Sequence, residues 1–532
     1  MSEAAAAIPA AAQARPAPAV NPWIIALVVT LATFMEVLDT SIANVSLPHI
    51  AGGLSAGVDE STWIITSYLV SNAIVLPMSG WFSSLIGRKR FYMACVALFT
   101  VSSFLCGLAP SLGALIVFRI LQGVGGGGLQ PSEQSILADT FSPAKRGMAF
   151  AMYGMAVVVA PAIGPTLGGW ITDNYSWRWI FYINLPVGLI SLLLTSRLIT
   201  DPPHLQGKRG EPGKIDYIGF SLIALGLGAL QIVLDKGQRE GWFDSNFIVA
   251  LIVVAVVALL AAIVWEWKSD HPIIDLTLFR DRSFAVSNAM MFMLGFVLLG
   301  STLLIPLFAQ TMLGYPATDA GLALMPGGLI IICSMPLVGF LLSRKFDPRI
   351  MMAFGLTMVS VSLFYMTRFD LSIDFWTLAT ARMLQGCGLG FLFVPINTVA
   401  YSYLPPQKNN AASGIINLSR NVGASVGISI VTTMLDRRAQ FHRNRLVAHL
   451  DPASTNVQAM LDGASARVQA HGASAAGAMQ QAYAMLQGAL QRQSEMLAYI
   501  DNFKMLALAT LILVPCVLLV RKPKGGGRMM AH

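Results

Sequence analysis

Long apolar runs recur along the whole chain, and short polar segments separate them. Fourteen runs have the 18 or more residues that a helix needs to cross roughly 30 Å of hydrocarbon. They begin close to the following residues: Trp23, Thr62, Phe91, Leu112, Gly147, Trp179, Tyr217, Phe247, Val286, Ala320, Met351, Trp376, Ala411 and Phe503. The pattern therefore predicts an all-α integral membrane protein with 14 transmembrane helices.

A segment of the fourth predicted helix recurs in the twelfth. "RILQGVG" starts at Arg119 and "RMLQGCG" at Arg382, 263 positions later. The loops that follow also match, "FSPAKRG" around Pro143 against "LPPQKNN" around Pro406. Helix k thus pairs with helix k+8, which predicts two six-helix bundles with helices 7 and 8 inserted between them. Duplicated six-helix halves are typical of transporters that work by rocking one half against the other.

This repeat divides the chain into segments. We expect the following parts: a disordered tail at 1–21, an N-terminal bundle at 22–198, inserted helices at 199–270, a C-terminal bundle at 271–521 and a short tail at 522–532.

Composition supports the membrane assignment. The chain is 55% hydrophobic and only 12% charged, which excludes a water-soluble globule. Lys and Arg concentrate in the loops after even-numbered helices, which predicts that both termini are cytoplasmic. The net charge of +8 therefore reports topology and requires no nucleic-acid partner. The five cysteines lie in apolar spans without paired spacing, so no metal site and no cofactor is predicted.

A few charged residues lie deep inside apolar spans. They are Glu36 and Asp39 in helix 1, Arg119 and Glu133 in helix 4, Arg382 in helix 12 and Arg420 in helix 13. Each would cost roughly 2.5–3.5 kcal/mol at a helix centre facing lipid. We therefore expect all of them to face protein or a water-filled cavity.

The charges of helix 4 belong to a polar stripe. At 100° per residue, an arc of about 80° contains Arg119, Gln122, Gly126, Gln130 and Glu133. The stripe is predicted to line the interior, where Gln122 and Gln130 are candidates for hydrogen bonds to a substrate. The alternative is that its charges serve only helix packing.

Proton movement would depend on carboxylates, because no histidine lies in the middle of a span. A rearrangement that exchanges a buried environment for one beside an arginine changes the proton affinity of a carboxyl group. Asp39 is the first choice for the proton carrier. Glu36, Glu133 and Arg119 complete the predicted proton-coupling set.

Several motifs resemble the fourteen-helix drug:proton antiporters of the major facilitator superfamily. "LDTSIANVSLP" is similar to the helix 1 signature of that family, whose acidic residue falls on Asp39, and "RILQGVG" is similar to the helix 4 motif, whose arginine is linked to proton coupling. "GWFSSLIGRKR" resembles a conformational gate, with Gly80, Gly87, Arg88 and Lys89 at the motif positions. This copy departs from the family at Ser84, where many members carry Asp.

Further motifs narrow the resemblance. "APAIGPTLGGW" looks like the antiporter motif of helix 5, in which Gly164, Pro165, Gly168 and Gly169 shape helix packing. "WRWIFYINLPVG" and "HPIIDLTLFRDRSF" are similar to the EmrB type. The resemblance implies proton-driven efflux of hydrophobic or amphipathic compounds across a bacterial inner membrane. It also implies two partners, a periplasmic adaptor protein and an outer-membrane channel.

The segment 436–500 between helices 13 and 14 is predicted to be a long periplasmic loop. Apolar residues recur at helical intervals in its second half, at Met479, Tyr483, Leu486, Leu490, Leu497 and Ile500. This amphipathic helix either lies on its own protein or the membrane surface, or docks the adaptor.

Two other functions compete with export. A proton-coupled importer or exporter of a specific metabolite would use the same fold. A membrane component that senses or supports without moving a substrate is also compatible. An enzyme is not expected, because the chain lacks HExxH, an intramembrane His or Cys cluster and a nucleophile–base spacing.

Overall fold

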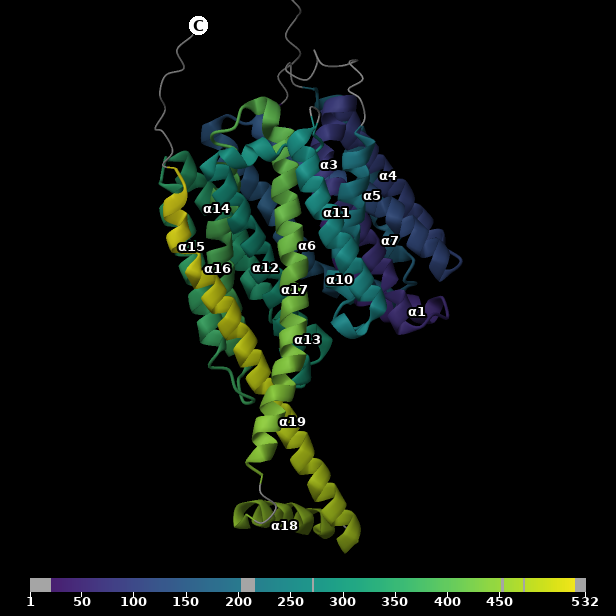
Figure 1. The fold of residues 1–532 in the computed structure, drawn as a ribbon, viewed down its shortest axis with the longest axis vertical. Coiled ribbons are helices and arrows are strands. Elements are labelled where there is room, and N and C mark those ends of the chain that lie inside the picture. Colours follow the sequence, from purple (N-terminus) through teal and green to yellow (C-terminus); the bar gives the residue numbers. More distant parts are fainter. Residues whose placement is uncertain (1–20, 202–215, 270–271, 451–453, 472–473, 522–532) are drawn as a thin grey trace, which may run out of the picture.

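The computed structural model describes residues 21–201, 216–269, 272–450, 454–471 and 474–521. Within these ranges all regular secondary structure is helical, and most helices stand side by side in one upright bundle (Figure 1). Both ends of the described chain lie at one end of the bundle, here named the termini end. The opposite end is named the hairpin end, because a helical hairpin extends from it.

The N-terminal half contains the first six predicted spans. Its helices are α1 (Pro22–Gly53), α2 (Val58–Ser61), α3 (Trp63–Ile86), α4 (Arg88–Leu108), α5 (Leu112–Thr140), α6 (Pro143–Asn174), α7 (Trp179–Tyr182) and α8 (Asn184–Leu198). The inserted pair consists of α10 (Tyr217–Lys236) and α11 (Asn246–Lys268), joined through the short 3-10 helix η1 (Trp242–Asp244).

The C-terminal half contains the remaining spans. Its elements are η2 (Leu276–Arg280), α12 (Arg282–Thr311), α13 (Ala317–Leu322), α14 (Met325–Ser343), α15 (Pro348–Met366), α16 (Phe375–Ala400), η3 (Pro406–Lys408), α17 (Asn409–Ala448), α18 (Thr455–Ala470), α19 (Ala475–Ile512) and η4 (Pro515–Leu519).

Most of the fourteen predicted spans meet a simple test of length and apolarity. Twelve helices pass it among the described residues, and the bent α6 raises the number to 13. The remaining predicted span, α17, does not pass it. Its first half carries buried polar residues, including Asn410, Asn417 and Arg420. Because α17 packs against α3, α5 and α12, these side chains face protein instead of lipid.

Packing repeats between the halves as the sequence repeat predicts. In the N-terminal half α1 packs on α6, α3 and α4 pack on α5, and α4 packs on α8. The C-terminal half has the same set: α12 on α17, α14 and α15 on α16, and α15 on α19. The caps repeat too, since Ser111 accepts a hydrogen bond from a backbone N–H at the start of α5 and Asp374 does so at α16.

The glycine run of α5 is helical throughout and lies against two neighbours. A Cβ on Gly127 would lie 2.6 Å from the carbonyl oxygen of Asn72 in α3, and one on Gly125 would lie 2.7 Å from the backbone nitrogen of Phe99 in α4. Side chains at these positions would therefore push both helices away.

Helices 13 and 14 are longer than predicted. The last membrane helix is not confined to residues after Phe503, because α19 begins at Ala475, and α17 continues to Ala448. With α18 across their tips, these extended ends form the hairpin extension, residues 436–500 (Figure 1). The predicted loop is therefore mostly helix that continues from the bundle.

The prediction of an amphipathic stripe in α19 is only partly correct. Met479 and Leu486 pack against α18, where Leu461 is buried, but the side chain of Tyr483 is 56% exposed. Ala482 is fully buried in its place. A small residue is needed there because α18 crosses α19 closely, so the contact face is one position away from the face of largest hydrophobicity.

Candidate functional site

Three buried carboxylates and two buried arginines lie among α1, α5 and α17. The carboxylates are Glu36, Asp39 and Glu133, and the arginines are Arg119 and Arg420. Each side chain is at most 7% exposed. The predicted stripe of α5 thus faces α1, and its charged members are enclosed by protein.

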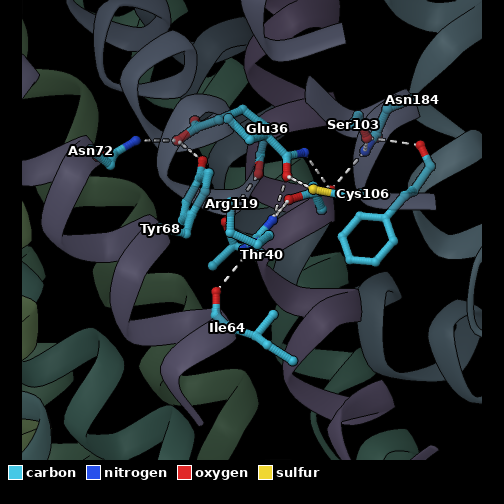
Figure 2. Close-up of polar contacts among 12 residues, drawn as sticks. Glu36, Thr40, Ile64, Tyr68, Asn72, Ser103, Cys106, Arg119 and Asn184 are labelled. Carbon is cyan, nitrogen blue, oxygen red and sulfur yellow. Dashed lines mark hydrogen bonds and ion pairs between the residues drawn. The ribbon is translucent and has the colours of Figure 1, made fainter. Parts of the chain in front are cut away.

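Asp39 and Arg119 form an ion pair. Nη1 of Arg119 lies 2.6 Å from Oδ2 of Asp39, and the Arg119 side chain is fully buried. The other carboxylate oxygen of Asp39 accepts hydrogen bonds from Gln122 at 3.0 Å and from Asn184 of α8 at 2.7 Å. Asn184 in turn donates to the hydroxyl of Ser103 at 2.9 Å (Figure 2). Two helices besides its own α1 therefore hold Asp39: α5 through Arg119 and Gln122, and α8 through Asn184.

The guanidinium of Arg119 also contacts a backbone carbonyl group and an aromatic ring. Its Nε donates to the carbonyl oxygen of Ile64 at 3.2 Å, and the ring of Tyr68 lies 4.2 Å from its central carbon (Figure 2). Nη2 has no hydrogen-bond partner among the described residues. Aromatic contact and charge pairing together stabilise a cation that has no access to water.

Glu36 lies one helical turn from Asp39 and has different partners. One oxygen accepts from the hydroxyl of Tyr68 at 3.1 Å and from the amide of Asn72 at 3.2 Å (Figure 2). The other oxygen accepts from Gln130 at 2.5 Å. The carbonyl oxygen of the same Gln130 amide accepts a hydrogen bond from Arg420. Gln130 therefore connects Glu36 in the N-terminal half to Arg420 in the C-terminal half.

Glu133 forms no ion pair with any described residue, and its hydrogen-bond partners are hydroxyls. Oε1 accepts a hydrogen bond from Thr30 at 2.7 Å, and Oε2 accepts one from Thr33. Both donors are neutral hydroxyls of α1. Its surroundings thus differ from those of Asp39, although both residues were predicted to serve the same purpose.

The two glutamines predicted to contact substrate are already engaged. Gln122 donates to Asp39 and accepts from Arg119 at 2.8 Å. Gln130 donates to Glu36 and accepts from Arg420. In this arrangement both amides position charges, and contact with a substrate stays a prediction.

The C-terminal half repeats the arginine but not the aspartate. Arg382 of α16 donates to Gln385 at 2.5 Å, as Arg119 does to Gln122. Where Arg119 meets Asp39, however, Arg382 meets the hydroxyl of Thr302 at 3.0 Å. Its Nε has no partner among the described residues. The charge pair is therefore a property of the N-terminal half.

A row of polar contacts joins the two halves, here named the α5–α17 ladder. Its four pairs are Gln130 with Arg420, Gln134 with Asn417, Ser135 with Ser413 and Asp139 with Asn409. The last three have donor–acceptor distances of 2.9, 2.7 and 2.6 Å. The ladder follows α5 over about 14 Å from the termini end inward. The sequence pattern did not single out Gln134 and Asp139. Only the polar residues of the span that becomes α17 could have indicated that it needs polar partners.

The predicted gating loop lies at the foot of this ladder. Arg88 is buried and pairs with Asp139 at 2.5 Å, while the backbone N–H of Lys89 donates to Asp201 at 2.7 Å. The hydroxyl of Ser84 donates to a carbonyl oxygen of its own helix. The charge of Arg88 is thus compensated from α5, without an acidic residue at position 84.

Two positions of the gating loop hold glycine for different structural reasons. Gly87 has φ +91°, a conformation that favours glycine, between α3 and α4. Gly80 lies against the start of α17, where an added Cβ would be 2.8 Å from Cα of Ala411. The loop therefore fixes a turn and a close contact between the halves.

The antiporter motif lies on α6, where Pro165 is inside the helix. Gly164 contacts Ser41 of α1, and a Cβ on Gly168 would lie 3.0 Å from the side chain of Ile42. Gly169 has open space around it. Three of the four predicted residues thus lie in or beside the α1–α6 contact, next to the helix that carries Glu36 and Asp39.

Nothing in the described ranges suggests a metal centre, since no group of three or more His, Cys, Asp or Glu side chains is placed to hold an ion.

Comparison with known proteins agrees with this architecture. Residues 29–428 match the family model of the Major Facilitator Superfamily. The chain is 40% identical over 440 residues to "Multidrug export protein EmrB" of Escherichia coli strain K12, covering 82% of this chain and 85% of that protein. It is 40% identical over 430 residues to "Fatty acid resistance protein FarB" of Neisseria gonorrhoeae, covering 80% of this chain and 83% of that protein.

Solved structures show the same fold at low identity. The proton:xylose symporter XylE matches with a TM-score of 0.60 at 14% identity, over 94% of this chain and 96% of that chain. The human organic anion transporter MFSD10 matches with a TM-score of 0.57 at 14% identity, over 78% of this chain and 94% of that chain.

Proposed function

Because the chain belongs to the major facilitator superfamily, we propose that it exports hydrophobic or amphipathic drug-like compounds by exchange for protons. It is a multi-pass membrane transporter and not an enzyme. Similarity to relatives named multidrug export proteins supports efflux across the inner membrane. The division into bundles at 22–198 and 271–521, with 199–270 inserted, is part of this proposal.

The termini end is proposed to face the cytoplasm. Basic residues at the helix ends and loops of that end support this orientation: Arg88, Lys89, Lys145, Arg146, Lys268, Arg280, Arg282, Arg344, Lys345, Arg349 and Lys408. Such an excess of Lys and Arg is typical of cytoplasmic loops. The hairpin extension then lies in the periplasm.

The buried pair of Asp39 and Arg119 is the observation that carries the proposal of proton coupling. A proton on Asp39 would cancel its attraction for Arg119 and leave the guanidinium with neutral partners only. Since an unpaired buried charge is unfavourable, protonation favours a different packing of α1 against α5. Exchange of the proton is thereby linked to the position of a helix.

Charge balance in the site supports this mechanism. Three carboxylates and two guanidiniums leave one negative charge uncompensated among these five side chains when all are ionised. One proton would balance the cluster. Glu133 is proposed as its place in this conformation, because its two partners are hydroxyls, with Asp39 and Glu36 as the other members of the path.

The proton gradient supplies enough free energy for export. One proton crossing 100 mV contributes roughly 2.3 kcal/mol, and one pH unit adds about 1.4 kcal/mol. Together they sustain a gradient of several hundredfold for a neutral substrate.

We further propose that the conformation described here is closed at the cytoplasmic end. The α5–α17 ladder and the contact of Gly80 with Ala411 support this, since all of them lie on the termini side. The pairing of α6 with α14 adds a second contact there, because a Cβ on Gly339 would lie 2.9 Å from Cα of Met148. Opening toward the cytoplasm then requires these contacts to separate.

A proteoliposome assay with an imposed pH gradient tests the function. We expect the native protein to move a fluorescent amphipathic cation against its gradient, and Asp39→Asn and Arg119→Ala to lose proton-driven transport. Asp370→Asn, an exposed carboxylate in a loop, is the matched control and should retain it. Normal proton-driven exchange by Asp39→Asn would remove Asp39 from the mechanism. Uptake in the direction of proton flow would favour the alternative, an importer of a specific metabolite.

The hairpin extension is proposed to dock a periplasmic adaptor that leads to an outer-membrane channel. It extends beyond the bundle (Figure 1). The side chains of Val447, Met460 and Tyr483 are exposed on it. Deleting 440–495 with a short linker should abolish adaptor capture while leaving membrane insertion intact. Undiminished capture by the deleted form would exclude this surface.

A further inference from the structure

A groove opens on the outer surface of the bundle where α10 meets α3, α4 and α5. Its volume is about 450 Å³. Its lining side chains are apolar apart from Ser71, and they include Ile74, Met78, Ala94, Val124 and Phe220. A volume of this size accommodates a ligand as large as a drug molecule or a lipid chain.

The groove is deep and faces the hydrocarbon of the bilayer. Its floor contains Met78, which is fully buried, and Cys95, which is 5% exposed. Its rim contains Ile86, Ile120 and Phe220, each about 40% exposed. The depth has a structural cause, because the glycines of α5 let α3 and α4 approach its backbone closely, at Asn72 for Gly127 and at Phe99 for Gly125.

A positive charge lies at the termini end of the groove. Arg90 is exposed in the first turn of α4, and the groove residues Ala94 and Leu98 follow it at i+4 and i+8. Residues at this spacing share one face of a helix. Ile86 ends α3 and Phe220 lies in the first turn of α10, so they mark the same end. The guanidinium of Arg90 therefore stands where lipid headgroups meet the protein.

We propose that this groove binds an anionic phospholipid, with one acyl chain between α10 and α4 and the phosphate on Arg90. The lining of α3, from Ser71 to Ile86, extends over about 22 Å. One leaflet of hydrocarbon is about 15 Å thick. A whole acyl chain therefore fits along the groove, and the bilayer supplies that ligand at high concentration.

The position of the lipid gives it a structural role. It fills the space between the inserted helix α10 and the N-terminal half, while α10 also contacts the C-terminal half. Gln231 of α10 donates to the hydroxyl of Ser425 in α17 at 3.0 Å. The bound lipid therefore supports the seam along which α10 joins both halves. Binding itself does not depend on the proposed transport function.

Photo-crosslinking in nanodiscs tests the site. The probe is phosphatidylglycerol with a diazirine in its acyl chain, mixed into phosphatidylcholine nanodiscs that hold the full-length protein. We expect crosslinks in peptides of α3, α4 and α10, and at least a fivefold loss in Ala94→Trp, which fills the groove. Ala250→Trp, an exposed alanine on α11 away from the groove, is the matched control and should keep the native yield.

The charge is tested separately with Arg90→Gln. An affinity loss of about fivefold is expected, because each basic residue near an anionic surface contributes about 1 kcal/mol. Arg90→Lys should keep most of the affinity. Arg280→Gln, which removes an exposed arginine at the same end, should keep all of it.

Three results would overturn the proposal. Crosslinks spread evenly over the lipid-facing helices would show no site. Equal labelling by a phosphatidylcholine probe would exclude recognition of an anionic headgroup. Displacement of the phospholipid by an equimolar free fatty acid would assign the groove to a transported amphiphile instead. Size-exclusion profiles of all variants identify any that fail to fold, and the comparison with the phosphatidylcholine probe on the native protein then carries the test of charge.

Discussion

Replacing Gly80 by alanine should weaken the closure of the termini end. The added Cβ would lie 2.8 Å from Cα and 2.9 Å from the backbone nitrogen of Ala411, both of which belong to the opposite half. Carbon atoms in favourable contact lie about 3.5–4.0 Å apart, so α17 must move by about 0.7 Å or more. Because the obstacle is backbone, no rotation of a side chain can relieve it.

The free-energy cost of this contact determines how far Gly80→Ala shifts the ratio of the closed and open conformations. Overpacking by one methyl group typically costs about 1–3 kcal/mol, which corresponds to a shift of roughly 5–150-fold in the ratio of two conformations. The higher helix propensity of alanine, about 1 kcal/mol, stabilises α3 in either conformation and does not oppose the shift. Gly113→Ala in α5 is the control, because its Cβ would enter open space.

Electron–electron double resonance between spin labels measures the shift. The labels are placed at Lys145 and Lys345, which are exposed at the termini end in different halves, after the five native cysteines are replaced by serine. We expect Gly80→Ala to add a population at longer distance and Gly113→Ala to retain the native distribution. If the two variants gave the same distribution, the contact between Gly80 and Ala411 would not control the closure.

Three further predictions concern the other charges and the extension. Thr302→Asp should give Arg382 a carboxylate partner and raise the free energy of unfolding by about 1–2 kcal/mol, as read from thermal unfolding in detergent; a decrease would show that burying the new carboxylate costs more than its pairing with Arg382 contributes. Burial disfavours the ionised Asp275, but hydrogen bonds and charge from Lys408 outweigh it and keep its pKa below the ordinary value. Its contribution to the free energy of unfolding is therefore complete above about pH 4 and is lost as pH falls further. Asp275→Asn should remove this contribution, about 0.2–1 kcal/mol as is typical of a surface pair, so that the melting temperature falls less steeply with decreasing pH below about pH 4. Leu461→Asp should detach α18 from α19 and abolish adaptor binding while transport in proteoliposomes persists; simultaneous loss of both would place the extension in the transport cycle.

The sequence was sufficient to predict which face of a helix is polar. It was less informative about the residues that this face contacts. The stripe of α5 follows from residue spacing alone, and its burial was expected from the cost of charge in lipid. Asn184, which holds Asp39, carries no such signal, because a single amide near the end of a helix is common in membrane proteins. Its position inside the motif "WRWIFYINLPVG" was the available indication.

Contacts between the halves were beyond prediction for a physical reason. The pair of Asp139 and Asn409 joins residues 270 positions apart, and neither residue is unusual near the end of its helix. Hydropathy also placed the end of helix 13 too early and the start of helix 14 too late. Apolarity ends where the lipid ends, whereas the helices of the hairpin extension continue because their polar residues are good helix formers that remain in water.

Gln130 is the residue through which the charge cluster and the closure of the termini end meet. Its amide nitrogen donates to Glu36 in the N-terminal half, while its carbonyl oxygen accepts from Arg420 in the C-terminal half. An amide can do both at once, whereas a carboxylate lacks the donor and an amine lacks the acceptor. When the halves separate, Arg420 must leave Gln130, and Glu36 then loses the nearest positive charge on the facing half. In the proposed transport cycle, the charge state of Glu36 and the separation of the halves therefore share one free-energy balance, as coupling between a proton and a conformation requires.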